Sequence, residues 1–355
     1  MEVFVSAWVG STNLGDELIF SALAGKLGRL GVKVTAASVS PASTALAHGV
    51  AAVPSSHPTQ LLGAMMRADR LVLGGGGLLQ DETSNVNLPY HMWRPVVARY
   101  LRTPIAGIGL GAGPLRTRGG RRWVQAGLRH VRALTVRDQP SADLLRSLGL
   151  EATVTADLAW SLPVPEARPP LDHFVVSLRP PVPASAWRTA AQGVRMPGED
   201  WVAAAAGALD EISGRTGLPA RFVAMQADRD QAVHELVAGR MSSPVSFSSP
   251  DLNGLINELG SGRIGIAMRY HAAIGTALAG RPVGLIGYSP KMEALASDLG
   301  DGAGLVANDP DGLRALPAAI ERVSGADEAM SAATARLRER EAGNDEAIHR
   351  LLERE

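Results

Sequence analysis

The sequence predicts an α/β protein with two tandem Rossmann-like domains and a cleft between them. Short β-branched runs alternate with longer segments of helical periodicity, which is typical of parallel strands joined by crossover helices. The alternation stops once, in the proline-rich stretch 161–172, and then resumes. Because 355 residues exceed what one core usually organises, we assign 1–165 and 172–325 to the two domains. Residues 326–355 are predicted to form a charged helical tail, packed on one side and otherwise solvated.

The N-terminal domain is expected to begin with a strand and a capped helix. Its strands are expected at 3–8, 32–37, 69–77, 103–113, 133–138 and 152–157. The first helix follows at 15–30, where leucine and isoleucine recur at helical spacing. Asn13 or Thr12 is placed to cap it, and Asp16 and Glu17 lie in its first turn, where the helix dipole favours acids.

The C-terminal domain repeats the alternation after the proline-rich stretch. Its strands are expected at 173–179, 220–225, 263–268 and 281–288, and its helices at 199–214, 229–239, 271–279 and 290–298. In such open parallel sheets, ligands bind outside the carboxyl ends of the strands. The residues that follow each strand are therefore the candidates for binding and catalysis.

Composition limits the partners of the chain. Lysine plus arginine and aspartate plus glutamate number 35 each, so no overall charge draws the protein to nucleic acid. The absence of cysteine rules out disulfides and thiolate chemistry. No apolar run approaches the roughly 18 residues of a membrane span, and the N-terminus lacks the features of a secretory signal. We expect a cytoplasmic protein whose contact with a membrane is at most transient.

Two stretches of the N-terminal domain place candidate ligand contacts after strands. Capping alone can explain Asp16, but at the mouth of a cleft its carboxylate could also accept a proton from a substrate hydroxyl. The four glycines of "LVLGGGGLLQD" cost chain entropy. At a strand end they suggest backbone N–H groups that meet a ligand, which makes Gly75 and Gly76 candidates, with Asp81 just beyond.

The segment "GIGLGAGPL" matches a weak dinucleotide pattern at Gly107, Gly109 and Ala112. It is not the first strand–helix turn of its domain, and no acidic residue stands about 20 positions further on. Pro114 also interrupts the expected helix. A nicotinamide cofactor is therefore not expected.

Two further aspartates follow strands in this domain. Asp138, which precedes a proline by two residues, is explained as a helix cap. Asp157 has no obvious capping role, so it is the better functional candidate.

The C-terminal domain places basic side chains at several strand ends. Arg179 follows the first strand, Arg269 and His271 follow the third, and Lys291 follows the fourth. A lysine near a helix N-terminus is unfavourable because its charge has the same sign as that end of the helix dipole. A bound anion between the two would remove this repulsion. Arginine suits carboxylate and phosphate, and histidine can act as a general acid near neutral pH. These residues predict a site for a small molecule with several negative charges.

In this order along the chain, several segments resemble the polysaccharide pyruvyl transferases, most strongly the bacterial branch that modifies secondary cell-wall polymers. The segments are "NLGDE", "GGGGLLQD", "GIGLGAGPL", "TVRD", "TAD", "SLR", "MRYHA" and "YSPKM". The resemblance implies two domains arranged as in GT-B glycosyltransferases. It also implies transfer of the enolpyruvyl group of phosphoenolpyruvate to two sugar hydroxyls, giving a cyclic pyruvate ketal and phosphate. Phosphoenolpyruvate is then a co-substrate, and no metal or other cofactor is expected.

The resemblance also suggests roles for the donor-side residues. His271 would act as acid or base, Arg179 and Arg269 would grip the donor, and Lys291 would help the phosphate to leave. Replacing His271 or Arg269 by alanine is then expected to abolish phosphate release and leave the fold intact. Tyr270 and the "SLRPP" segment depart from the family pattern, which affects the expected shape of the donor pocket.

On the acceptor side, the resemblance suggests that Asp16, Asp81 or Asp157 orients or deprotonates a sugar hydroxyl. The acceptor, a sugar or a lipid-linked saccharide, would rest against the glycine loop at Gly75 and Gly76.

Two other functions fit the same residues. A GT-B glycosyltransferase could bind the diphosphate of a nucleotide sugar with an arginine and a lysine, although Glu293 is the one nearby acid for its ribose. A non-catalytic protein that binds anions or sugars would leave function largely intact when His271 is replaced.

Overall fold

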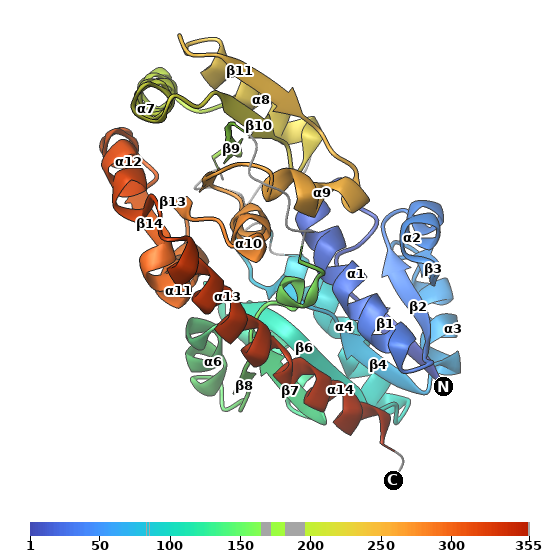
Figure 1. The fold of residues 1–355 in the computed structure, drawn as a ribbon. Helices are drawn as coiled ribbons and strands as arrows, with labels where there is room; N and C mark the ends of the chain where they lie inside the picture. Colours follow the sequence, from blue (N-terminus) through green and yellow to red (C-terminus); the bar gives the residue numbers. More distant parts are fainter. Residues whose placement is uncertain (83, 85, 165–171, 182–195, 354–355) are drawn as a thin grey trace.

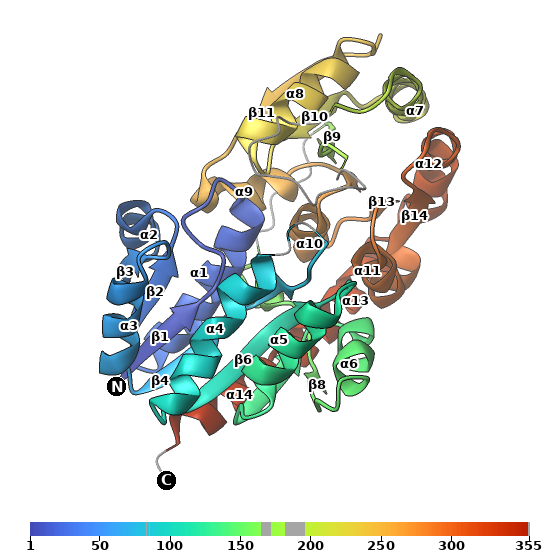
Figure 2. The same cartoon turned by 180° about the vertical axis from the view of Figure 1, so that it is seen from behind.

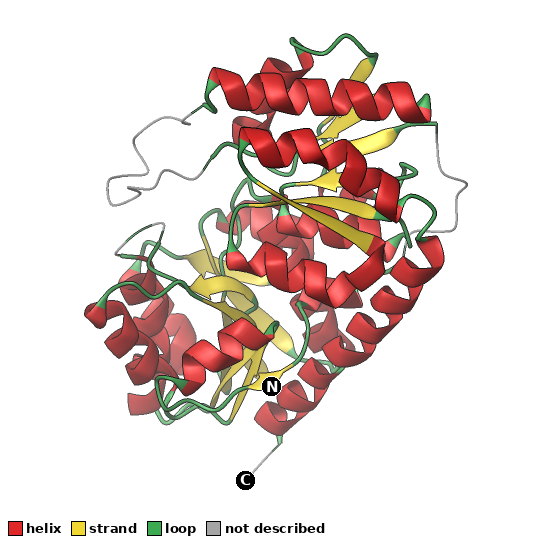
Figure 3. Cartoon of the chain, turned by 90° about the vertical axis from the view of Figure 1, so that its left-hand side faces the viewer, coloured by secondary structure: helices red, strands yellow, loops and turns green. Residues whose placement is uncertain are grey.

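The computed structural model describes residues 1–82, 84, 86–164, 172–181 and 196–353. Two parallel sheets, each with helices packed on it, form two domains (Figure 1 and Figure 3), which confirms the predicted fold class. The predicted linker is described only in part, because residues 165–171 lie outside the described residues. Among the described residues, no helix combines the length and apolar character needed to cross a bilayer.

The N-terminal domain is built on an eight-stranded parallel sheet. Its strands are β1 (Glu2–Ser6), β2 (Lys33–Ser38), β3 (Ala51–Pro54), β4 (Arg70–Leu73), β5 (Gly76–Leu79), β6 (Ile105–Ala112), β7 (Ala133–Val136) and β8 (Thr153–Val154). Its helices are α1 (Leu14–Arg29), α2 (Pro41–His48), α3 (Pro58–Arg67), α4 (Asn87–Tyr100), α5 (Arg118–Leu128), α6 (Gln139–Arg146) and the 3₁₀ turn η1 (Leu158–Ser161). The strand order is β3-β2-β1-β4-β6-β7-β8, and β5 pairs with the end of β6.

The C-terminal domain is built on a six-stranded parallel sheet. Its strands are β9 (Phe174–Ser177), β10 (Ala220–Val223), β11 (Val245–Ser248), β12 (Gly265–Ala267), β13 (Val283–Gly287) and β14 (Ala303–Ala307). Its helices are α7 (Glu199–Thr216), α8 (Ala227–Ala238), α9 (Leu252–Leu259), α10 (Tyr270–Leu278), α11 (Pro290–Leu299), the turn η2 (Gly300–Gly302) and α12 (Pro310–Val323). The order β11-β10-β9-β12-β13-β14 is that of a Rossmann sheet, so its topological switch point lies between β9 and β12.

The predicted tail forms α13 (Asp327–Glu341) and α14 (Gly343–Leu352), which pack on both domains (Figure 1). Lys26 on α1 is buried, and its Nζ lies 3.0 Å from a carboxylate oxygen of Glu341. Asn344 is fully buried and accepts hydrogen bonds from the Thr135 and Thr155 hydroxyls of the N-terminal domain at 2.6 and 2.9 Å. On the other side, the Thr334 hydroxyl donates to a carbonyl of α10. The segment is therefore a strap across the domains.

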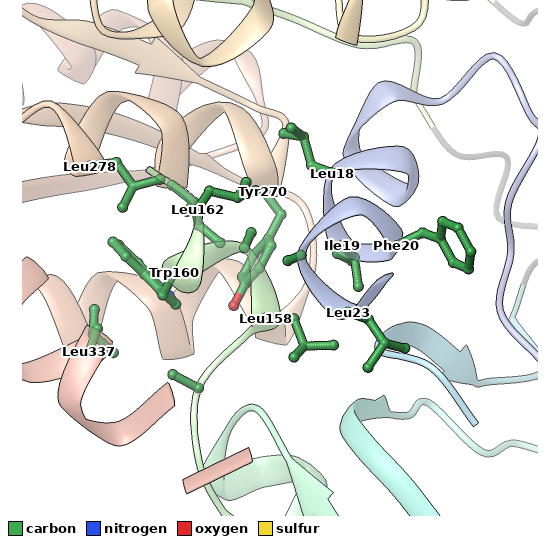
Figure 4. Close-up of a cluster of buried hydrophobic side chains, with 14 of the residues drawn as sticks. Leu18, Ile19, Phe20, Leu23, Leu158, Trp160, Leu162, Tyr270, Leu278 and Leu337 are labelled. Carbon is green, nitrogen blue, oxygen red and sulfur yellow. The ribbon is translucent and has the colours of Figure 1, made fainter. Parts of the chain in front are cut away.

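A shared apolar core joins the two domains behind their facing strand ends. It contains buried residues from both sheets and from the strap. Figure 4 shows side chains of α1, η1, α10 and α13 meeting there: Leu18, Ile19, Leu23, Leu158, Trp160, Leu162, Tyr270, Leu278 and Leu337. This core fixes α1 and α10 close together, and both helices begin at the candidate site.

Candidate active site

The strand ends of the two domains face each other at their switch points. The backbone N–H of Leu14, at the start of α1, donates to the carbonyl of Met225 after β10 at 2.9 Å. The Gln226 side chain donates to the Thr12 hydroxyl at 3.0 Å. These bonds bring the loop after β1 against the loop after β10, at the carboxyl edge of the C-terminal sheet.

Gly15 lets the two helix N-termini approach each other. A side chain at this position would collide with the imidazole Nδ1 of His271 in the first turn of α10. Asn13 caps α1, since its side chain accepts a hydrogen bond from the Gly15 N–H, and this confirms the predicted cap. The glycine of "NLGDE" is thus explained by the histidine of "MRYHA", more than two hundred residues away.

His271 lies beside Asp157 at the base of the site. The imidazole Nε2 is 3.7 Å from Asp157 Oδ2, and it has no hydrogen-bond partner within the described part of the chain. Asp157 is buried and accepts hydrogen bonds from the Ala159 N–H at 3.0 Å and from Arg137 at 3.2 Å. Burial alone would raise the pKa of Asp157, but His271, Arg137 and the Ala159 N–H together hold it well below its usual range.

Asp157 also caps η1, a role that its sequence context does not suggest. Its carboxylate is therefore ionised and fully occupied, which suits orientation of His271 better than proton uptake from a sugar.

The buried Arg137 side chain stabilises the His271–Asp157 pair. It contacts both Asp138 and Asp157, and its Cζ lies 4.5 Å from the centroid of the Tyr270 ring. A side chain at Gly111 would overlap its guanidinium, so this glycine of "GIGLGAG" makes room for an arginine. Asp138 caps α6 by accepting from the Ser141 N–H at 2.9 Å, as predicted.

Asp16 is the half-buried acid on the N-terminal side of the site. Burial raises its pKa, while the charges of His271 and Lys291 and a hydrogen bond from Asn13 oppose that increase. The net pKa lies above its ordinary value, so this carboxylate is the stronger base of the two aspartates near His271.

Arg179 and Lys291 converge on one tyrosine at the other side of His271. The Arg179 Cζ lies 4.7 Å and the Lys291 Nζ 5.1 Å from the centroid of the Tyr288 ring. Neither cation has an acidic residue within ion-pair distance among the residues that the structure describes. Burial would raise the pKa of the Tyr288 hydroxyl, but the charges and hydrogen bonds of Lys291 and Arg179 lower it to about 8.

Two serine hydroxyls at the same sheet edge are buried without a partner in the described structure. Ser177 ends β9, and Ser289 precedes α11 without capping it. Pro290 has no N–H, and the Met292 N–H donates to the Ser289 carbonyl at 2.9 Å. Lys291 itself and the positive end of the α11 dipole are therefore what this helix start offers an anion.

Arg269 differs from these cations because it is buried and already paired. Its Nε lies 3.1 Å from Asp230 Oδ2, and its Nη2 contacts the other oxygen of the same carboxylate. Asp230 also accepts the N–H groups of Met225 and Gln226 at the start of α8. The structure thus gives Arg269 an architectural partner that the sequence pattern did not suggest, and its predicted contact with the donor stays a prediction.

Asp81 lies in a separate network. Its two oxygens accept hydrogen bonds from the Arg116 and Thr117 N–H groups at 2.7 and 2.8 Å and from the Thr117 hydroxyl at 2.6 Å. These bonds, against the opposing effect of burial, lower its pKa. The carboxylate orders the loop before α5, so the geometry adds nothing to its predicted role in acceptor binding.

The glycine run is only partly a loop, since Gly76 already begins β5. A side chain at Gly75 would collide with Leu158 and Ile19, so packing explains that glycine. Gly76 has φ +95°, a conformation that favours glycine, and a side chain there would lie 3.8 Å from Asp16 Oδ1. Four acceptor contacts were predicted: Gly75, Gly76, Asp81 and Asp157. Of these, Gly76 lies near Asp16 and Asp157 lies near His271.

Sequence reasoning missed Tyr288, Ser177 and Ser289. A signal for Tyr288 was present, because an aromatic residue in "GYSPKM" stands directly between a strand and the helix that carries Lys291. Nothing in the sequence shows that Arg179 reaches the same ring.

The arrangement of two facing Rossmann-like domains places the chain in the GT-B fold class. It is similar to the UDP-GlcNAc 2-epimerase from Neisseria meningitidis (12% identity, 93% and 94% of the two chains covered, TM-score 0.60). It is also similar to a glycosyltransferase from Rickettsia africae (12%, 100% and 99%, TM-score 0.60) and to spinosyn rhamnosyltransferase (13%, 99% and 99%, TM-score 0.54). At these identities the similarity establishes the fold alone.

The family model described as polysaccharide pyruvyl transferase matches residues 13–290. Since this match covers most of the chain, the protein belongs to the polysaccharide pyruvyl transferase family, which confirms the resemblance seen in the sequence. No curated protein sequence matches the chain significantly. Family membership supports a transferase that acts in polysaccharide modification.

Proposed function

We propose that this protein transfers the enolpyruvyl group of phosphoenolpyruvate to two hydroxyls of a cell-wall or exopolysaccharide sugar. The products are a cyclic pyruvate ketal and phosphate. The observation that carries the proposal is the pair of cations without acidic partners, Arg179 and Lys291, beside the His271–Asp157 pair. Because phosphoenolpyruvate is a metabolite of the cytoplasm, a cytoplasmic location is part of the proposal.

On the donor side, Lys291 and the first turn of α11 suit the phosphate, and Arg179 suits a carboxylate or phosphate oxygen. Tyr288, Ser177 and Ser289 supply hydroxyl donors at the same edge. Arg269 is proposed to hold the start of α10 through Asp230 and to reach the donor with its remaining nitrogen.

Proton transfer is proposed to begin at His271. The protonated imidazole gives its proton to the methylene carbon of phosphoenolpyruvate, which becomes a methyl group, and the neighbouring carbon becomes electrophilic. Asp157 stabilises the charged imidazole before the transfer, since the two groups lie 3.7 Å apart.

Two carbon–oxygen bonds then form and one breaks. A sugar hydroxyl oxygen bonds to the electrophilic carbon, and its proton passes to Asp16. The bond from this carbon to the phosphate oxygen breaks, and Lys291 and Arg179 stabilise the leaving phosphate. The second hydroxyl closes the ketal and returns a proton to His271, while the proton on Asp16 leaves with the phosphate.

On the acceptor side, the sugar is proposed to lie between Asp16 and the backbone near Gly76. The proposed acceptor is either a free sugar or a lipid-linked saccharide. Gly75 and Asp81 remain proposed acceptor contacts, but with less support. Packing already explains Gly75, and hydrogen bonds within a loop already explain Asp81.

Mass spectrometry of synthetic amino-sugar acceptors incubated with phosphoenolpyruvate tests the proposal. A mass gain of one pyruvyl ketal, together with equal release of phosphate, is the expected result. A glycosyl transfer product from a nucleotide sugar, with none from phosphoenolpyruvate, would instead support the function suggested by the fold alone. Binding of either ligand without any product would mean that the protein has no turnover.

A further inference from the structure

One stretch of the N-terminal domain is strongly and uniformly basic. Residues 83–137 contain ten arginines and no aspartate, glutamate or lysine. The whole chain has equal numbers of basic and acidic residues, so the rest of it carries ten more acidic than basic residues. The net charge of zero therefore hides an uneven distribution of charge along the chain, which the overall composition does not show.

The fold leaves six of these ten arginines exposed on or next to two neighbouring helices. Helices α4 and α5 lie side by side on the N-terminal sheet, on the side seen in Figure 2. Six exposed arginines on and next to the two helices form what we term the arginine face: Arg99, Arg102, Arg118, Arg121, Arg122 and Arg129. On α5, positions 118, 122 and 129 recur at helical spacing and so form one exposed stripe.

The arginine face lacks acidic partners. None of its six arginines forms an ion pair with an acid in the described part of the chain. Elsewhere on the surface, exposed arginines lie against carboxylates, as in Arg146 with Asp143 and Arg240 with Glu199. Nearby, loss of solvation and the charges of Arg99 and Arg129 lower the pKa of His130. The two arginines thus both contribute to a positive potential at this position.

Exposed apolar side chains from the end of α4 and from α3 border this face. Tyr100 is 81% exposed, Met66 66% and Leu101 36%. Met66 and Leu101 line a surface hollow together with three arginines, Arg70, Arg102 and Arg132, and one acid, Asp69. Arginines beside an exposed tyrosine and aliphatic side chains match the chemistry of a bilayer surface, where phosphate groups lie next to hydrocarbon.

We propose that the arginine face docks on a lipid surface that carries anionic headgroups. The arginines would contact lipid phosphates, and Tyr100, Leu101 and Met66 would enter the headgroup region. A soluble polyanion without apolar groups, such as heparin, would use the arginines but would leave these apolar side chains exposed. The proposal does not depend on the reaction proposed above.

Sedimentation of the full chain with vesicles tests the docking. We expect binding to phosphatidylcholine vesicles that contain phosphatidylglycerol, weak binding to phosphatidylcholine alone, and loss of binding as salt rises. The triple variant Arg99→Gln, Arg122→Gln, Arg129→Gln should bind about a hundredfold more weakly, at roughly fivefold per arginine.

A matched variant separates this face from overall charge. Arg29, Arg322 and Arg336 are exposed, lie on α1, α12 and α13, and form no ion pair within the described structure. The variant with glutamine at these three positions has the same net charge, and it should bind vesicles like the unmodified protein. Equal losses in both triple variants would overturn the proposal.

A third variant separates a bilayer from a soluble polyanion. Tyr100→Ser should weaken binding to anionic vesicles severalfold and leave binding to heparin unchanged. Binding to heparin without binding to vesicles, or equal binding to neutral and anionic vesicles, would also overturn the proposal. Thermal unfolding of each variant, with a midpoint close to that of the unmodified protein, excludes misfolding because all the substituted side chains are exposed.

Discussion

Two pairs of basic residues at the carboxyl edges of the sheets have opposite surroundings. Arg179 and Lys291 are half-buried, contact the Tyr288 ring and have no acidic partner among the described residues. Arg137 and Arg269 are buried and paired with aspartates. The first pair keeps its charge available for a ligand, whereas the second uses its charge to hold the site together. Position at a strand end therefore does not decide whether a cation binds a substrate; the acids that reach it do.

The largest effect on activity is expected at His271, which lies near both pairs of basic residues. His271→Ala should lower phosphate release from phosphoenolpyruvate by about a thousandfold, because it removes the proposed acid and its proton relay. Steady-state phosphate release measures this effect. The exposed His57 provides a control, since His57→Ala should leave the rate unchanged. A rate close to that of the unmodified protein in His271→Ala would exclude the mechanism.

The second prediction contrasts the two kinds of arginine directly. Arg179→Ala should raise the KM for phosphoenolpyruvate about tenfold to a hundredfold, because a charged hydrogen bond is lost, and should leave the free energy of unfolding nearly unchanged. Arg269→Ala should lower the free energy of unfolding by about 3–5 kcal/mol, because Asp230 is left buried without its partner. Chemical unfolding and donor kinetics of both variants separate these effects.

A double substitution sharpens the contrast. Arg269→Met with Asp230→Asn removes both charges and should recover part of the lost stability. If the double variant is stable yet still fails to bind phosphoenolpyruvate, Arg269 contacts the donor itself, as the sequence predicts. If binding returns with stability, its role is to hold α10 in place.

The third prediction concerns the pH dependence set by the unpaired cations. Lys291 and Arg179 lower the pKa of Tyr288 to about 8. Above this pH, the tyrosinate cancels one of the two positive charges and pairs with the cations that would bind the anionic donor, so kcat/KM should fall about tenfold per pH unit. Tyr288→Phe should remove this decrease, and an unchanged pH profile in that variant would show that the hydroxyl does not face the donor.

The same ionisation affects stability with a definite sign. Between about pH 8 and 10 the unfolded tyrosine keeps its proton while the folded one has lost it. The unfolded state then binds more protons, so the free energy of unfolding should rise with pH in this range. Tyr288→Phe should lack this rise in pH-dependent unfolding experiments.

The smallest effect on donor chemistry is expected at Asp81. Asp81→Ala removes the acceptor of two N–H groups and one hydroxyl, so it should lower the free energy of unfolding by about 1–3 kcal/mol. The KM for phosphoenolpyruvate should not change. Asp69→Ala, at an exposed aspartate that accepts one N–H, is the control for loss of a carboxylate. A raised KM for the sugar acceptor would support the acceptor contact predicted from the sequence.

The sequence carried enough information for the fold because the periodicity and the proline-rich break are local signals. The domains, the cap at Asn13 and the cap at Asp138 follow from them. The edge strands β3, β11 and β14 were not predicted. They are four or five residues long and largely half-exposed or exposed, so they lack a continuous apolar run. Likewise, β5 is hidden in the glycine run, where pairing with β6 overrides low strand propensity.

The sequence predicts residues of the candidate site, but not which of them contact one another. "MRYHA" and "TAD" each name one half of the His271–Asp157 contact, and only the fold brings them within 3.7 Å. The partner of Arg269 lies on α8, in a segment with no motif, so nothing local shows that this arginine is neutralised. Conversely, the collision that a side chain at Gly15 would cause explains a glycine for which helix propensity offers no reason.

The strap formed by α13 and α14 has a consequence for how the protein is made. Ile348 and Leu351 of α14 cover apolar residues of the N-terminal sheet, so that half cannot complete its interior when its own strands have been synthesised. The N-terminal domain therefore completes its core only after α14 has been synthesised. Removing α14 should therefore expose hydrophobic surface in the N-terminal half rather than merely shorten the protein.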